Sequence, residues 1–262
     1  DENNAYAWEW NGEGYIAVTT GALVFARDLF VSVLDNDDLR ELTSKYGERA
    51  EFDFRAFLFV VFEFLLSHEL AHITNGHLSY TGTSQCMAER RRTPRESLEQ
   101  LESQTLEMDA DAMAVNDHIR FMIGIERTGH LGYLQASLLR WMISLGLYFR
   151  MFGNDCQLTD GIPASTHPPF VCRRFWSLMA AHATLEKEGV DASIIQAFQE
   201  EWPIVLAKIE KAIMPAIGQA ESLEGIRTAV SPEGQAYSTK IREYWNVLRP
   251  KLVPYSIRKL AP

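Results

Sequence analysis

Apolar and polar residues follow two different periods along this chain, and the change between them separates the expected strands from the expected helices. The first twenty residues are rich in aromatic and β-branched types, and Asn11-Gly12 stands between two short runs of them. An Asn-Gly pair in that position is typical of a two-residue hairpin turn. The pattern predicts strands over Ala5–Trp10 and Tyr15–Thr19, closed by Gly21.

Beyond Gly21 the apolar positions recur at helical spacing through most of the chain. The most apolar segment, Phe52–Asn75, is predicted to be one long helix that stops at Asn75-Gly76. Thr93-Pro94 is a typical start signal for another, charged helix. Further predicted helices are Ala22–Leu34, Arg95–Arg127, Leu131–Phe152, Phe170–Glu186, Ala192–Ile213 and Gly234–Leu248, with loops at Ser79–Arg92 and Gly153–Pro169 and an irregular tail from Pro250 to Pro262.

The predicted fold class is therefore α+β and mainly α, with a small N-terminal β-hairpin or edge sheet and a helical C-terminal part. A chain of 262 residues can bury a sizeable core in one elaborated domain. No repeat or obvious linker divides it. We expect a core over residues 1–174 and a helical extension over residues 175–262, packed on the same domain.

Composition narrows the class of partner. The chain has 25 basic and 35 acidic residues, a formal charge of −10, which argues against nucleic acid or an anionic membrane. Three widely spaced cysteines (Cys86, Cys156 and Cys172) suggest free thiols in a reducing compartment. The apolar runs Phe57–Leu66 and Leu131–Phe149 are interrupted by polar residues, so no stable membrane span is expected. A cytoplasmic location is predicted, with the membrane periphery or the periplasm as alternatives.

The segment from His68 to His72 carries the strongest chemical signal. Histidines four positions apart lie on one face of a helix, about one turn apart, so both imidazoles can reach one ion. Zinc is favoured among the common metals. Glu69 can accept a proton from a metal-activated water while staying outside the ligand shell. Burying these groups in an apolar helix would be costly without a metal as partner.

A catalytic zinc site of this type needs a third protein ligand, and Glu107 is the best candidate. It lies 35 residues beyond His72 (107 − 72), enough to cross a loop and return on an antiparallel helix. Asp111 shares its helix face and could accept a hydrogen bond from a ligand imidazole. Taken alone, without the histidine motif, the two carboxylates would be more typical of a solvated acidic face.

The other histidines suit other roles. His77 would face away from the ligands if the helix continued, so it is interpreted as a helix-end residue. His118 is about 16 Å along its helix from the third ligand, too far for ligation, and is interpreted as structural. His167 precedes two prolines on a rigid loop and could donate to an oxyanion. Arg173 could reach the same region or pair with a carboxylate.

Taken in order, these segments resemble the gluzincin family of zinc peptidases that contains the CAAX prenyl endopeptidases, HtpX and the BepA-type proteases. The resemblance covers roughly residues 4–174. The zinc helix is shared by many groups of peptidases, but four segments in this order are much more specific. The matching segments are Asn4-Ala5-Tyr6-Ala7 with Gly14–Gly21, His68–His72 with His77, Glu107–Asp111, and Thr166–Pro169 with Arg173.

The resemblance implies a zincin-like fold and one Zn²⁺ per chain. It implies His68, His72 and Glu107 as the ligands and Glu69 as the catalytic base. It also implies that Asp111 supports a ligand from behind.

The same resemblance extends to the substrate. It implies that His167 lies near the transition-state oxyanion, and Arg173 is a candidate contact to the transition state or substrate. It further implies that a peptide pairs as an extra strand along Asn4, Ala5, Tyr6 and Ala7. A weaker resemblance to the phage-exclusion Lit-type peptidases would imply a cytoplasmic enzyme that cuts one cellular protein.

The prediction from sequence is thus a zinc-dependent endopeptidase that hydrolyses a protein or peptide with metal-activated water. One alternative is a binding module with a structural zinc, which would need a fourth protein ligand. Another is a metal hydrolase for a non-peptide substrate. A third is a latent peptidase whose cleft is covered by Phe170–Pro262 or by Ser79–Arg92.

Overall fold

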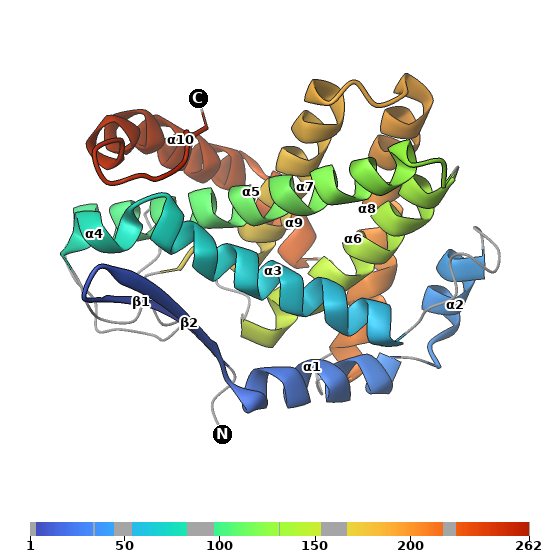
Figure 1. Cartoon of the computed structure of the whole chain (residues 1–262). Helices are drawn as coiled ribbons and strands as arrows, with labels where there is room; N and C mark the ends of the chain where they lie inside the picture. Colours follow the sequence, from blue (N-terminus) through green and yellow to red (C-terminus); the bar gives the residue numbers. More distant parts are fainter. Residues whose placement is uncertain are drawn as a thin grey trace.

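The computed structural model describes residues 4–33, 35–44, 54–82, 97–130, 132–152, 167–216 and 224–261. It confirms a mainly helical α+β chain with one small antiparallel sheet (Figure 1). The elements are β1 (Ala5–Trp10), β2 (Glu13–Val18), α1 (Thr20–Val33), α2 (Asp37–Ser44), α3 (Phe54–Thr74), α4 (His77–Thr81), α5 (Ser97–Arg127), α6 (Tyr133–Phe152), α7 (Phe170–Lys187), α8 (Ala192–Ala216), α9 (Glu224–Val230) and α10 (Pro232–Leu252).

The N-terminal hairpin forms where the sequence predicts it. Strand β1 pairs with β2 in antiparallel register, from Ala5 opposite Val18 to Trp10 opposite Glu13. Asn11 and Gly12 make the turn with φ of 52° and 77°. Positive φ at both central residues matches the right-handed twist of paired strands, which explains why Asn-Gly is favoured there.

Some helix predictions need correction. The predicted loop Ser79–Arg92 begins inside a helix, because α4 covers His77–Thr81 after Gly76 turns the chain with φ of 80°. The predicted irregular tail also begins in a helix, since α10 runs through Pro250 to Leu252. A proline so near a helix end removes one backbone hydrogen bond only. Residues 83–92 and 153–166 of the predicted loops lie outside the described residues.

Helices α2 and α9 were not predicted. They have eight and seven residues, too few for the apolar period to stand out. The long helices α3, α5, α6, α7 and α8 end within a few residues of their predicted limits wherever those limits are described.

The main apolar core joins residues from β1 to α10, so the segments before and after residue 174 share it. Phe64 of α3 packs against Tyr148 and Phe149 of α6, with ring centroids 4.7 and 5.8 Å apart. Burial of one such side chain stabilises the fold by roughly 1.5–3 kcal/mol. A second cluster holds α10 and the C-terminal segment against α5, through Leu106, Trp245, Leu248, Leu252 and Leu260.

Helices α3 and α5 lie side by side and antiparallel (Figure 1). Polar partners along their contact follow a steady register: position 63 meets 118, position 68 meets 111, and position 72 meets 107. Each pair of numbers sums to 179 or 181, as two antiparallel helices in fixed register require. The polar faces of the two helices therefore meet inside the protein.

Among the described residues, α3 is also the one helix that is long and apolar enough to cross a membrane. The segment is Arg55–Thr74, with a mean hydropathy of 1.6. Half of that window is buried within the protein. A buried core helix passes the same test of length and composition. The absence of a stable membrane span therefore stays a prediction.

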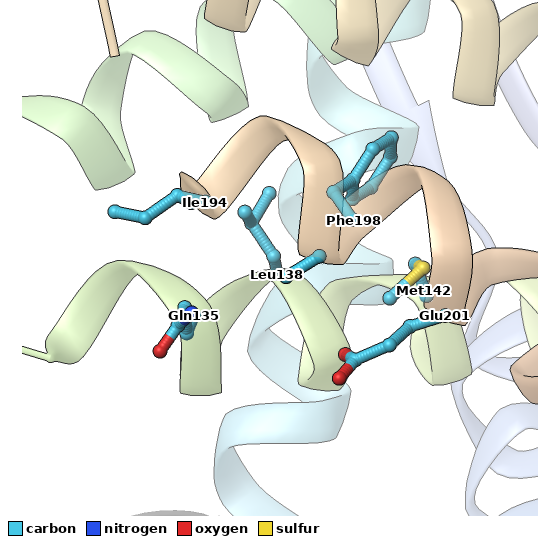
Figure 2. Close-up of a pocket in the computed structure, with 7 residues that line it drawn as sticks. Gln135, Leu138, Met142, Ile194, Phe198 and Glu201 are labelled. Atoms are coloured by element: carbon cyan, nitrogen blue, oxygen red, sulfur yellow. The ribbon is translucent and has the colours of Figure 1, made fainter. Parts of the chain in front are cut away.

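A pocket lies between α6 and α8 (Figure 2). Its lining is mostly apolar, from Leu138, Met142, Ile194 and Phe198, with Gln135 and Glu201 as polar members. Neither helix carries a residue of the predicted zinc site. The pocket is therefore separate from the chemistry described next.

Candidate metal centre

The two motif histidines converge from consecutive turns of α3. Both side chains are buried, with 1% of each residue exposed. The Nε2 atoms of His68 and His72 lie 3.1 Å apart, and the ring planes meet edge to face at 77°. This is the arrangement that a spacing of four positions on a helix allows.

Helix α5 brings Glu107 to the same point. One carboxylate oxygen lies 3.4 Å from Nε2 of His68, and the other lies 3.5 Å from Nε2 of His72. Glu107 is 2% exposed. Within the described part of the chain, these three residues form the one group whose donor atoms could jointly hold a metal ion.

The separations within this group suit a tetrahedral ion. Zinc bonds of about 2.0–2.2 Å at tetrahedral angles place ligand atoms roughly 3.3–3.5 Å apart. The observed separations of 3.1, 3.4 and 3.5 Å fall around that value. In addition, Oε2 of Glu107 is buried and receives no hydrogen bond from the described residues. A cation would satisfy that oxygen, so the residues fit zinc.

Asp111 and Arg173 support His68 from behind. The Nδ1 atom of His68 lies 2.9 Å from Oδ1 of Asp111. Arg173 of α7 donates to both oxygens of Asp111, from Nε at 2.8 Å and from Nη2 at 2.9 Å. A carboxylate clamped in this way can hold a ligand imidazole in one orientation.

The charges around His68 favour a positive charge at that position. Burial disfavours its imidazolium, but the adjacent carboxylates of Asp111 and Glu107 outweigh burial and raise its pKa to about 10. For Asp111, burial favours the neutral acid, and Arg173 and His68 outweigh it and lower its pKa. The acidic groups thus prepare the site for a cation.

His72 and Glu107 are held in the forms that bind metal. Burial lowers the pKa of His72 well below its usual range, so its imidazole is neutral. Burial of Glu107 would raise its pKa, but His167 and His68 hold that pKa well below the usual range. Neutral imidazole and ionised carboxylate are the states that coordinate zinc.

His77 is a helix-end residue, as interpreted from the sequence, but it has a contact that the sequence does not indicate. Helix α3 ends at Thr74, and the chain turns at Gly76 before His77 begins α4. As a result Nδ1 of His77 lies 3.0 Å from Nδ1 of His72. The signal that could have revealed this is the glycine, which breaks the helix one residue before the histidine.

The other predicted site residues lie at different distances from the three candidate ligands. Glu69 follows His68 on α3 and is 1% exposed. His167 lies just before α7, with its Nε2 3.7 Å from Oε2 of Glu107. Arg173 Nη2 is also 3.7 Å from that oxygen, besides its bonds to Asp111. The structure thus brings His167 and Arg173 to the carboxylate of the metal group.

The predicted substrate edge lies in and beside β1. The backbone carbonyl of Asn4 accepts from the backbone N–H of Thr19, and the backbone N–H of Asn4 donates to the Thr19 hydroxyl. Ala5 and Ala7 are buried, while Tyr6 is half-buried. The hairpin packs on α3. A Cβ atom on Gly14 of β2 would lie 2.6 Å from Ile73, the residue after His72. The hairpin therefore borders the histidine helix near its ligand-bearing end.

His118 lies in a different group, as its distance along α5 predicts. Its Nδ1 hydrogen-bonds to a carboxylate oxygen of Glu63 on α3. Ser67 donates to the other oxygen of Glu63 at 3.2 Å. The histidine is buried, whereas the carboxylate side chain is 26% exposed. This closed pair joins α3 to α5 away from the metal group.

Sequence reasoning named the three candidate ligands and their support through Asp111. It missed Asp109, which accepts hydrogen bonds from Asn75 and pairs with His77, because one of several acids on a helix carries no distinguishing pattern. Tertiary structure alone selects it.

Comparisons of the chain with protein-family models, with curated proteins and with solved structures find no match.

Proposed function

We propose that this protein is a zinc-dependent endopeptidase with a zincin-like arrangement, in which His68, His72 and Glu107 hold the ion. The observation that carries the proposal is the buried convergence of their donor atoms at 3.1–3.5 Å, with an oxygen of Glu107 that lacks a hydrogen bond. A satisfied structural cluster would have no such surplus of acceptors.

The number of ligands supports a catalytic rather than a structural zinc. Structural zinc sites close with four protein ligands, whereas catalytic sites keep one position open. Asp111 and His77 are engaged with the Nδ1 atoms of the two histidines, on the side away from the ion position. Neither is therefore available as a fourth ligand. Among the described residues, the group of donor atoms within reach of one ion consists of His68, His72 and Glu107 and does not include His167.

The chemistry follows from the residues around that position. When bound, zinc supplies Lewis-acid polarisation of the scissile carbonyl and lowers the pKa of water. Glu69, next to a ligand on α3, is suited to take a proton from the attacking water and pass it to the leaving amine. His167, beside Glu107, is suited to donate to the oxyanion, and Arg173 keeps Asp111 in place.

A peptide substrate is favoured over other hydrolysable substrates by the neighbouring hairpin. Its β1 strand is one of just two strands in the described sheet, and the hairpin packs on the helix of His68 and His72. An extended peptide can add to such a sheet through backbone hydrogen bonds. Asn4 to Ala7 is the segment proposed to receive it.

The burial of the ligands supports a second candidate function, a latent peptidase whose metal centre is covered. The side chains of His68, His72 and Glu107 are 1–3% exposed, whereas that of His167 is 19% exposed. Access to the centre would therefore be from the side of His167. If the protein is latent, cleavage activity should appear only after limited proteolysis, and equal activity before and after would exclude latency.

The deciding experiment combines metal analysis with Glu69→Gln in the full chain. Wild type should bind about one zinc per chain and cleave proteins, as measured by a survey of new termini in a cell lysate. Glu69→Gln should keep the zinc and lose cleavage, because the amide cannot accept the proton. Glu63→Gln, six residues earlier on the same helix, is the matched control and should keep both.

Three results are decisive. A wild-type protein without zinc affinity would overturn the metal centre. Zinc binding with no new termini, before or after limited proteolysis, would favour a structural zinc. Cleavage that survives Glu69→Gln would remove this residue as the base.

A further inference from the structure

Behind His72 lies a second buried group that the proposed reaction does not use directly. His77 is 0% exposed, and its Nδ1 lies 3.0 Å from Nδ1 of His72. Its Nε2 lies 3.1 Å from Oδ2 of Asp109. Asn75 donates its side-chain N–H to the same oxygen at 2.6 Å. A continuous chain of contacts therefore runs from the metal group to a carboxylate.

When both imidazoles are neutral, only one placement of hydrogens on the ring nitrogens is compatible with these contacts. An ionised carboxylate only accepts hydrogen bonds, so Nε2 of His77 carries a hydrogen and donates to Asp109. The Nδ1 of His77 then has a lone pair, and Nδ1 of His72 donates to it. Nε2 of His72 is left with its lone pair facing Glu107, which is the form that binds a metal.

We propose that His77 is a positioning residue that, held by Asp109 and Asn75, fixes His72 in its metal-binding tautomer. The inference rests on the metal centre of the proposed function. Ligand histidines commonly donate their second N–H to a carboxylate, a carbonyl or water. Here the imidazole of His77 accepts the N–H of His72, and Asp109 in turn holds His77. His68 instead contacts Asp111 directly, so each ligand histidine depends on its own partner.

The turn at Gly76 is what makes this contact possible. On a continuing helix His77 would be rotated by roughly 500° from His72, nearly to the opposite face. Gly76 adopts φ of 80°, and a Cβ atom there would lie 2.6–2.7 Å from the backbone and Cβ of Tyr255. The C-terminal segment thus packs against the turn and leaves room for glycine only, which holds His77 beside His72.

The test replaces His77 and measures the metal rather than activity. In the full chain His77→Leu should weaken zinc binding by roughly 10–100-fold, measured by competition with a chromogenic chelator. The visible absorption of the cobalt(II)-loaded protein should also change, because His72 is no longer held in one tautomer. His77→Asn keeps an acceptor oxygen near the Nδ1 position and should recover most of the affinity.

His118→Leu is the matched control. His118 is also a buried histidine that hydrogen-bonds to a carboxylate across α3 and α5, but its partner is Glu63. This variant should lower the free energy of unfolding and leave zinc affinity and the cobalt spectrum unchanged. If His77→Leu does not fold, Asp109→Asn makes the same test, since an amide no longer dictates which nitrogen of His77 carries the hydrogen.

The outcomes separate this inference from the proposed function. If wild type binds zinc and both His77→Leu and Asp109→Asn bind it as tightly, the positioning role is overturned and the metal centre stands. If His118→Leu weakens zinc binding as much as His77→Leu, the effect is general helix destabilisation and the role is again overturned. A wild type without zinc affinity overturns both.

Discussion

Helices α3 and α5 bury histidine against carboxylate at two places, and the two places differ in their balance of donors and acceptors. At the first, His118 and Ser67 both hydrogen-bond to Glu63, so each carboxylate oxygen has a partner. At the second, His68 and His72 face Glu107, whose Oε2 receives no hydrogen bond from the described residues. The first pair is complete, whereas the second leaves an acceptor that suits a cation.

This difference shows why burial and opposite charge do not by themselves mark a functional site. Two neighbouring arginines of α7 make the same point: Arg174 forms a buried pair with Glu210 of α8, and Arg173 forms one with Asp111. Their chemistry is equal, but Asp111 also contacts a candidate ligand. What distinguishes the metal group is a surplus of lone pairs at one point.

The largest expected effect is the loss of a ligand. His72→Ala should weaken zinc binding more than roughly 1000-fold, about 4 kcal/mol, because a shell of three would fall to two. His118→Ala should leave zinc binding within experimental error of wild type. Isothermal titration of metal-free protein measures both, and equal losses in the two variants would mean that the two groups do not differ as proposed.

Removal of the metal is the next largest effect. Zinc at about 100 times its dissociation constant should stabilise the folded state by about 2.7 kcal/mol, and a chelator should abolish that gain. Urea unfolding with and without the chelator measures the change. The same comparison on His72→Ala should show little shift, and a full shift there would place the bound zinc elsewhere.

A smaller effect is expected at the pair formed by His118 and Glu63. His118→Leu removes a donor from Glu63 and should cost about 1 kcal/mol of unfolding free energy, near the low end for an unsatisfied group because the carboxylate is 26% exposed. Double replacement by Glu63→Gln with His118→Leu should recover part of that loss. Urea midpoints for the single and double variants give the answer, and a wholly additive result would contradict direct pairing.

The smallest expected effect concerns Glu102, a third carboxylate of α5, whose Oε2 accepts two phenol hydrogen bonds. Glu102 accepts hydrogen bonds from Tyr80 at 3.2 Å and from Tyr244 at 3.0 Å. Burial and the bond to Glu102 raise the pKa of Tyr244 to about 12. The folded state thus favours the protonated phenol, so this stabilisation is complete below pH of about 10 and is lost as pH rises toward 12.

Since Tyr244 is only partly buried, solvent screens this interaction and the contribution should stay below about 1 kcal/mol. Tyr244→Phe should therefore lose less stability than wild type between pH 10 and 12, as measured by urea midpoints at fixed ionic strength. Identical slopes for the two proteins would show that the phenol has the same pKa in the folded and unfolded states.

The sequence by itself determined the local features of the fold. The hairpin turn follows from Asn11-Gly12, and the shared face of His68 and His72 follows from the rotation of about 100° per residue in a helix. The same rotation places Glu107 and Asp111 on one face of α5. These features depend on neighbours within a few positions, so they can be inferred before the fold is known.

Only the tertiary structure decided which groups meet. Five carboxylates from Glu102 to Asp117 lie on one long helix, and the register of α5 against α3 alone places Glu107 between the histidines. Arg173 selects Asp111 because α7 packs on α5. His77 reaches His72 because Gly76 and the distant Tyr255 shape the turn. Such contacts depend on packing between distant segments, which no local period of the sequence encodes.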